Sequence, residues 1–104
     1  MEIIKDIPVR ELVPGINGYY RHGAAMTLGL VLIDKGTSLP MHQHPHEQIT
    51  YMIKGELEMQ IGDETVLLTP GSVQVIPSNV LHGATAHSDC ELIDVFNPIR
   101  EDYR

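Results

Sequence analysis

The stretch that decides the fold covers residues 36–55 and reads GTSLPMHQHPHEQITYMIKG. His42 and His44 lie two positions apart, so on a strand both side chains leave the same face. Pro45 ends or bends that strand, and the chain enters another strand at Gln48. Two imidazoles and an amide oxygen from a neighbouring strand can converge on one cation. The stretch therefore predicts part of a metal site built on β-structure.

The rest of the chain also favours β-structure. Gly and Pro interrupt it about every eight to twelve residues, which is the spacing of an all-β sandwich or barrel. Gly62 and Asp63 are expected to form a two-residue hairpin turn with positive φ at Gly62. A length of 104 residues predicts a single domain over residues 1–104. We expect strands at about residues 18–22, 25–33, 39–42, 48–54, 56–61, 64–68, 72–76, 82–86 and 91–96.

A second stretch supplies another candidate ligand. His82 follows the turn at residues 77–81 and begins a later strand, so it is a plausible fourth ligand from across a barrel. Together the two stretches resemble the two motifs of the cupin superfamily, at about residues 36–55 and 71–86. The first motif matches at Gly36, His42, His44, Gln48 and Gly55, and the second at Gly71, Pro77, Asn79 and His82.

The resemblance implies an all-β, single-domain cupin, which is a double-stranded β-helix or jelly-roll barrel. It also implies one divalent metal ion held by His42, His44, Gln48 and His82. Gln48 stands where most metal cupins have Glu, and Asn79 where many have Gly. With a neutral amide in the ligand set, the ion keeps its full charge and favours an anionic ligand. Ni, Zn, Fe, Mn and Cu all suit these donors.

Three other histidines and one acid lie outside this set. Glu47 is one position out of phase with Gln48 and is expected to point away from it. We interpret His46 as a solvated turn residue. We interpret His22 and His87 as surface residues.

The C-terminal stretch carries further polar candidates. Leu92, Asp94 and Phe96 share one strand face, so Asp94 is expected to point into the barrel. Burying a carboxylate is costly without a partner, so Asp94 is a candidate proton-transfer group; a salt bridge or a strand-end cap is the alternative. Arg100 could fold over the barrel mouth and bind a carboxylate in a bidentate pair, or be a solvated tail residue.

The segments around residues 42–48, 77–84 and 94–102 resemble the KdgF family, small cupins of uronate metabolism linked to pectin and alginate breakdown. The resemblance implies an isomerase-like enzyme that converts 4,5-unsaturated uronate monosaccharides to linear ketonized products. It places functional residues at Asp94, Phe96 and Arg100. Two alternatives stay open. One is a non-catalytic sugar- or metal-binding module, and the other is a metal-dependent dioxygenase, a class that usually keeps the carboxylate replaced here by Gln48.

The composition and net charge of the chain limit the classes of partner that it is expected to bind. The formal net charge of −7 disfavours nucleic acid and anionic membranes as partners, and no apolar run is long enough to span a bilayer. The N-terminus lacks a signal-peptide pattern, so we expect a cytoplasmic protein. Cys90 is the only cysteine, which excludes an internal disulfide. Residues 28–33 are apolar on both faces, which predicts a homodimer; the alternative is that residues 3–13 cover them.

Overall fold

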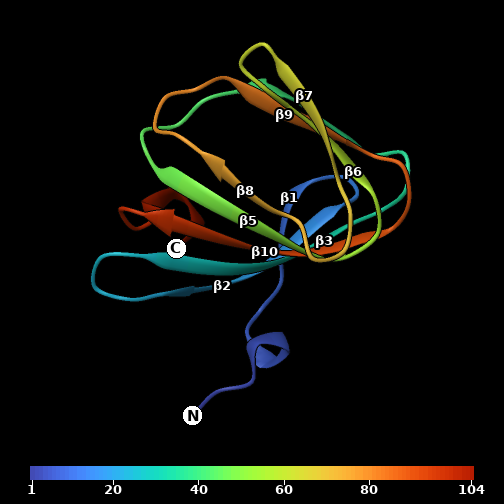
Figure 1. Cartoon of the computed structure of the whole chain (residues 1–104). Helices are drawn as coiled ribbons and strands as arrows, with labels where there is room; N and C mark the ends of the chain where they lie inside the picture. The colour runs from blue at the N-terminus through green and yellow to red at the C-terminus, as the bar shows by residue number, and fades with distance from the viewer.

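Strand β5 (Glu47–Lys54) shows how the sequence forms a barrel, because its residues alternate between the interior and the outer surface. Gln48, Thr50 and Met52 are buried, whereas Ile49 and Tyr51 are exposed. This confirms the expectation that the first three share a face. The computed structural model describes all of residues 1–104. In it, strands of this kind form two sheets with the core between them (Figure 1).

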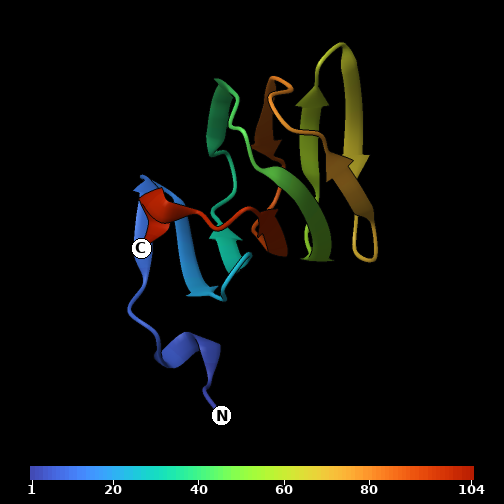
Figure 2. The same ribbon diagram turned by 90° about the vertical axis from the view of Figure 1, so that its left-hand side faces the viewer.

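The larger sheet has six strands in the order β1-β2-β3-β10-β5-β8, and the smaller has four in the order β4-β9-β6-β7. All strand pairs are antiparallel. Figure 2 shows the two sheets as separate layers. Besides β5, the elements are η1 (Ile4–Asp6), β1 (Arg10–Val13), β2 (Ile16–His22), β3 (Thr27–Ile33), β4 (Ser38–His42), β6 (Leu57–Ile61), β7 (Glu64–Leu68), β8 (Val73–Ile76), β9 (His82–Ala86), β10 (Cys90–Asn97) and η2 (Glu101–Tyr103).

The expected all-β jelly-roll fold is confirmed. Two glycines let the chain turn as this fold requires. Gly62 has φ of 56° in the hairpin where Ile61 pairs with Glu64, as predicted. Gly55 has φ of 90° where the chain passes from the larger sheet to the smaller. A Cβ atom at Gly55 would lie 2.3 Å from the carbonyl oxygen of Asp89, so only glycine fits there.

Nine of the ten strands lie where the sequence predicts strands, and β1 is the one that was missed. β1 is a four-residue edge strand that pairs only with β2. Its register shifts between Glu11 and Val13, so it lacks a clean alternation of apolar and polar residues. A short, irregular edge strand gives a weak sequence pattern.

The N-terminal segment covers only part of the outer face of the larger sheet. Helix η1 contacts β2, Lys5 lies 3.8 Å from Glu91, and Glu2 pairs with Arg21. The segment leaves the body on the side of the six-stranded sheet that faces away from the smaller sheet (Figures 1 and 2). The outer faces of β5 and β8 stay exposed. The helical elements are the two short 3-10 turns η1 and η2. The structure contains no helix that is long and apolar enough to cross a membrane.

Candidate metal centre

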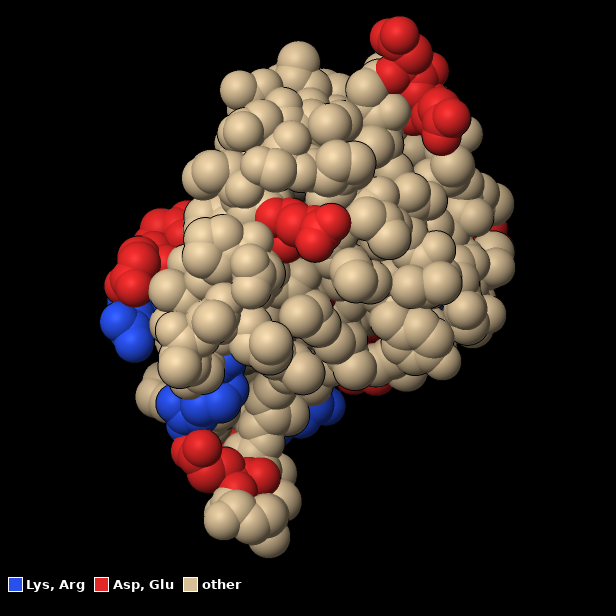
Figure 3. Space-filling view, turned by 60° about the vertical axis from the view of Figure 1, so that its left-hand side comes forward, with Lys and Arg blue, Asp and Glu red and all other residues tan.

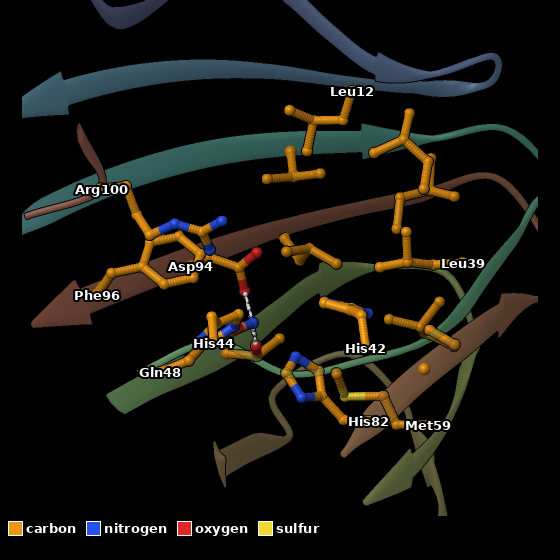
Figure 4. Close-up of a pocket in the computed structure, with 18 of the residues that line it drawn as sticks. Leu12, Leu39, His42, His44, Gln48, Met59, His82, Asp94, Phe96 and Arg100 are labelled. Carbon is orange, nitrogen blue, oxygen red and sulfur yellow. Dashed lines mark hydrogen bonds between the residues drawn. The ribbon is translucent and has the colours of Figure 1, made fainter. Parts of the chain in front are cut away.

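Three histidines meet between the two sheets. His42 ends β4 and pairs in register with His82, which begins β9. His44 lies in the turn that leads to β5. One candidate ligand atom from each of the three rings lies within 4.8 Å of the others. Gln48, from the opposite sheet, lines the same cavity (Figure 4).

Backbone carbonyls orient all three rings. Each Nδ1 lies 2.9 Å from a carbonyl oxygen two residues away. Because a carbonyl only accepts, Nδ1 carries the hydrogen and the Nε2 lone pair of a neutral ring is free for a metal. Burial lowers the pKa of His44, and it lowers the pKa of His82 to about 4, so both rings are neutral at pH 7. The carbonyls belong to Pro40 for His42, His46 for His44 and Val80 for His82.

The amide of Gln48 is oriented by hydrogen bonds to its nitrogen. Nε2 donates to Thr50 Oγ1 and to Asp94 Oδ1, both at 3.0 Å, and the Thr50 hydroxyl donates to Asp94 Oδ1 at 2.6 Å. Oε1 therefore faces Nε2 of His44 at 3.1 Å. With the hydrogen of His44 on Nδ1, two acceptors face each other at that distance. A shared cation relieves this repulsion, so these residues fit a divalent metal ion.

The turn at residues 77–80 supports this cluster. Asn79 has φ of 63°, and its backbone N–H donates to the carbonyl of His44 at 2.8 Å. Ser78 donates its hydroxyl to the carbonyl of Pro45. Among residues other than glycine, asparagine is one that tolerates the left-handed region. This accounts for an asparagine at a position where many cupins have glycine.

Asp94 lies beside the cluster, on the inward face of β10, as predicted. It lines the cavity and accepts the hydrogen bonds from Gln48 and Thr50 (Figure 4). It forms no ion pair within the chain, so the salt-bridge alternative is wrong. Burial raises the pKa of Asp94 to about 6; the two hydrogen bonds and the charge of Arg100 act in the opposite direction.

Arg100 also lines the cavity and is only 6% exposed, so the alternative of a solvated tail residue is wrong. Its guanidinium carbon lies 4.7 Å from the ring centre of Phe96 and 4.0 Å from that of Tyr103. Nε and Nη2 donate to the carboxylate of Asp102 at 3.0 and 2.7 Å. A bidentate pair therefore exists already, with Asp102. The edge formed by Nη1 and the second hydrogen of Nη2 makes no hydrogen bond within the chain.

Two histidines have contacts that the sequence analysis missed. His46 is half-buried, and its Nε2 lies 3.2 Å from the carbonyl oxygen of Ile99, so the interpretation as a solvated turn residue is wrong. His22 contacts Thr27 and the carbonyl of Tyr103, so it is not a free surface residue. No local pattern could have revealed either contact with the C-terminal segment, because the partners lie 53 and 81 positions away. His87 is exposed, as expected.

Sequence comparison finds named relatives of this chain. The H2HPP isomerase of Bacillus subtilis is 33% identical over 92 residues, which are 85% of this chain and 39% of that protein. The pectin degradation protein KdgF of Dickeya dadantii is 34% identical over 71 residues, 66% of this chain and 64% of that protein. The chain thus spans less than two thirds of either relative.

Solved structures agree with the fold over nearly the whole chain. The structure of KdgF from Halomonas sp. superposes with a TM-score of 0.90 at 32% identity, covering 98% of this chain and 96% of that one. An RmlC-like cupin from Shewanella frigidimarina superposes with a TM-score of 0.92 at 26% identity, covering 99% and 94%. The family model described as a cupin domain matches residues 29–96. The chain therefore belongs to the cupin family, and it is a small cupin similar to KdgF.

Proposed function

We propose that the protein is a metal-dependent enzyme that converts 4,5-unsaturated uronate monosaccharides to linear ketonized products. The observation that carries this proposal is the juxtaposition of the histidine cluster, Asp94 and Arg100 around one cavity. Such a site combines a cation, a base and an anion-binding group. The similarity to a protein named for pectin degradation, and to the structure of a second KdgF, supports the substrate class. The relative named an isomerase supports a reaction without redox change.

In this proposal His42, His44, Gln48 and His82 hold one divalent ion, either Ni, Zn, Fe, Mn or Cu. When bound, the ion supplies a Lewis acid that attracts the substrate carboxylate and stabilises negative charge developing on a neighbouring oxygen. All four donors are neutral, so they leave the charge of the ion uncompensated. This favours an anionic sugar over a neutral one.

The side chains around the ion account for the proton movements. Asp94 takes the proton of the anomeric hydroxyl, the bond from the anomeric carbon to the ring oxygen breaks, and an aldehyde forms. The former ring oxygen is left as an enolate, and the proton that Asp94 took, delivered to C4, completes the ketone at C5. Arg100 binds the carboxylate through its free edge. Phe96 packs against the sugar ring.

The direct test follows the C4=C5 double bond by its ultraviolet absorbance. Unsaturated galacturonate is mixed with protein loaded with each candidate metal in turn, and the loss of absorbance is compared with the protein-free rate. We expect a faster loss with at least one metal. A rate equal to the protein-free rate with every metal would contradict the enzyme and leave a binding module. Oxygen consumption would point to the dioxygenase alternative.

We also propose that the protein acts as a homodimer through the exposed outer face of the larger sheet. The strand register places two apolar rows side by side on this face. Tyr51 and Val73 are 46% and 64% exposed. On the side of the molecule that Figure 3 presents, which is not this face, charged side chains stand in small groups with uncharged areas between them. One row contains Leu28, Val95, Ile49 and Val75, and the other contains Ile93, Tyr51 and Val73 and ends at Leu30, which is only 9% exposed.

The size of this face favours a second copy as its occupant. The exposed apolar side chains form a patch on the order of 500 Å², at the upper end of what monomers expose. A standard interface buries about 800 Å² per partner, so the patch is large enough for the centre of one. A two-fold contact needs only one self-complementary face, and neither row has a charged side chain between β3 and β8; Arg21 of β2, beside Leu28, marks the charged edge of the first row.

Tyr51→Glu is expected to convert the dimer to a monomer, because the substitution places two charges in the centre of the buried contact. Sedimentation velocity at micromolar concentration measures the mass, which is 11.6 kDa for the monomer. The matched control is Leu67→Glu, which changes an equally exposed apolar residue on β7 of the smaller sheet and should leave the dimer intact. A monomeric wild type would refute the proposed interface.

A further inference from the structure

The cavity wall that carries Arg100 is not part of either sheet. Residues 98–104, here called the C-terminal strap, follow β10 and contain only the short turn η2. Arg100 and Tyr103 of the strap both line the cavity. A segment without strand pairing needs other contacts to hold its side chains in place. In this structure those contacts come from the β2–β3 hairpin, from β1, and from His46, whose Nε2 lies 3.2 Å from the carbonyl oxygen of Ile99.

Thr27 makes the most buried of these contacts. It is the first residue of β3, is 0% exposed, and pairs in the sheet with Phe96 on one side and His22 on the other. Its Oγ1 accepts the backbone N–H of Arg100 at 2.9 Å. The same oxygen lies 2.8 Å from Nδ1 of His22. Thr27 therefore joins the hairpin to the residue that carries the guanidinium.

His22 extends this link to the next turn of the strap. Its Nε2 lies 3.2 Å from the carbonyl oxygen of Tyr103. Because that carbonyl only accepts, Nε2 donates, and Nδ1 then accepts the hydroxyl hydrogen of Thr27. This one arrangement satisfies both ring nitrogens, the threonine hydroxyl and the Arg100 N–H together. A fully satisfied network of this kind fixes geometry better than separate contacts do.

The hairpin contacts also determine where the guanidinium lies. Arg100 is held between Phe96, which is fixed in β10, and Tyr103, which moves with the strap. Arg10 of β1 adds an outer contact by donating to the carbonyl of Asp102 at 2.8 Å. If the strap shifts, the ring of Tyr103 no longer packs against the guanidinium of Arg100. The hydrogen bonds from Nε and Nη2 of Arg100 to the carboxylate of Asp102 are then no longer held in the same place. Displacements of about 1 Å in a binding group are enough to weaken substrate binding.

We propose that Thr27 and His22 are positioning residues that hold Arg100 in place to bind the substrate carboxylate. This inference rests on the proposed function, because it assigns that role to Arg100. Neither residue contacts the metal cluster, so their loss affects substrate binding and leaves the metal site intact. The effect is expected in KM and not in kcat.

Thr27→Val and Thr27→Ser form a matched pair of variants. Valine has nearly the same shape but removes the oxygen, leaving the Arg100 N–H unpaired, whereas serine keeps the hydroxyl. With Thr27→Val we expect KM for unsaturated galacturonate to rise about tenfold, with kcat and the metal-to-protein ratio unchanged. Thr27→Ser should restore KM to within about twofold of the wild type. An unchanged KM, or a loss of metal together with kcat, would overturn the inference.

Trypsin supplies a readout that does not depend on activity. Arg100 is buried in the wild type, so the bond to Glu101 should resist cleavage, whereas in Thr27→Val the freed strap should lose residues 101–104, as seen by mass spectrometry. A strap that stays uncut in Thr27→Val also overturns the inference. Should that variant not fold, His22→Phe at a half-buried position repeats both measurements with the same expectations. A wild type without turnover would instead contradict the proposed function, and the protease result would still decide whether Thr27 holds the strap.

Discussion

His44→Ala is expected to lose its metal ion and, with it, all turnover above the protein-free rate. His44 is buried, and its Nε2 and Oε1 of Gln48 lie 3.1 Å apart as two acceptors for the same ion, so the substitution removes one of the ligands. Loss of a mere supporting hydrogen bond costs about 10- to 100-fold in metal affinity, so loss of a ligand should exceed 100-fold. Elemental analysis after dialysis measures the metal-to-protein ratio, and the absorbance assay measures turnover.

The matched control for this prediction is His87→Ala. His87 is exposed and follows β9, and the one hydrogen bond of its side chain is to the carboxylate of Glu58 at 3.1 Å, so its imidazole takes no part in the histidine cluster. It should keep both metal and turnover. Removing the ion from the wild type with a chelator should reproduce the His44→Ala result, and restoring Ni, Zn, Fe, Mn or Cu singly identifies the active metal. If His44→Ala keeps a full complement of metal, the histidine cluster is not the site.

Much of the metal centre could be predicted because it follows the two-residue period of a strand. The alternation along β5 places Gln48 inward, and the same rule applied to β10 places Asp94 and Phe96 inward. The pairing of His42 with His82 could not be predicted, because no periodicity shows that β4 lies beside β9. The sequence predicts His82 as a ligand from across the barrel, and it comes instead from the strand next to that of His42.

The strap and its contacts could not be predicted, because they join residues far apart in the sequence. Thr27 meets Arg100 across 73 positions, and His22 meets Tyr103 across 81. A histidine near a hairpin turn has the same local pattern whether it is solvated or bonded to a distant carbonyl. The pair between Arg100 and Asp102 is local, but only the burial of Arg100 shows which edge of its guanidinium stays free.

Asp94 explains why glutamine replaces glutamate in the first motif. Nε2 of Gln48 donates to Asp94 Oδ1 at 3.0 Å. A glutamate at this position would place two carboxylates at about the same separation inside the barrel, and like charges so close cannot both be ionised at low cost. The amide instead donates to the carboxylate and turns its oxygen towards His44. The inward aspartate and the neutral ligand therefore form one arrangement.

Asp94→Asn separates the chemical role of this carboxylate from its support of Gln48. An asparagine oxygen can still accept the hydrogen bonds from Thr50 and Gln48, so the ligand set keeps its geometry and the metal-to-protein ratio should not change. The substitution removes the base, and general-base catalysis contributes about 10²- to 10⁴-fold, so kcat should fall by that amount. Asp94→Ala removes the acceptor as well and should also weaken metal binding, by about 10-fold or more. If Asp94→Asn keeps kcat, or loses its metal, Asp94 is a structural partner of Gln48 and the proton must be taken by another group.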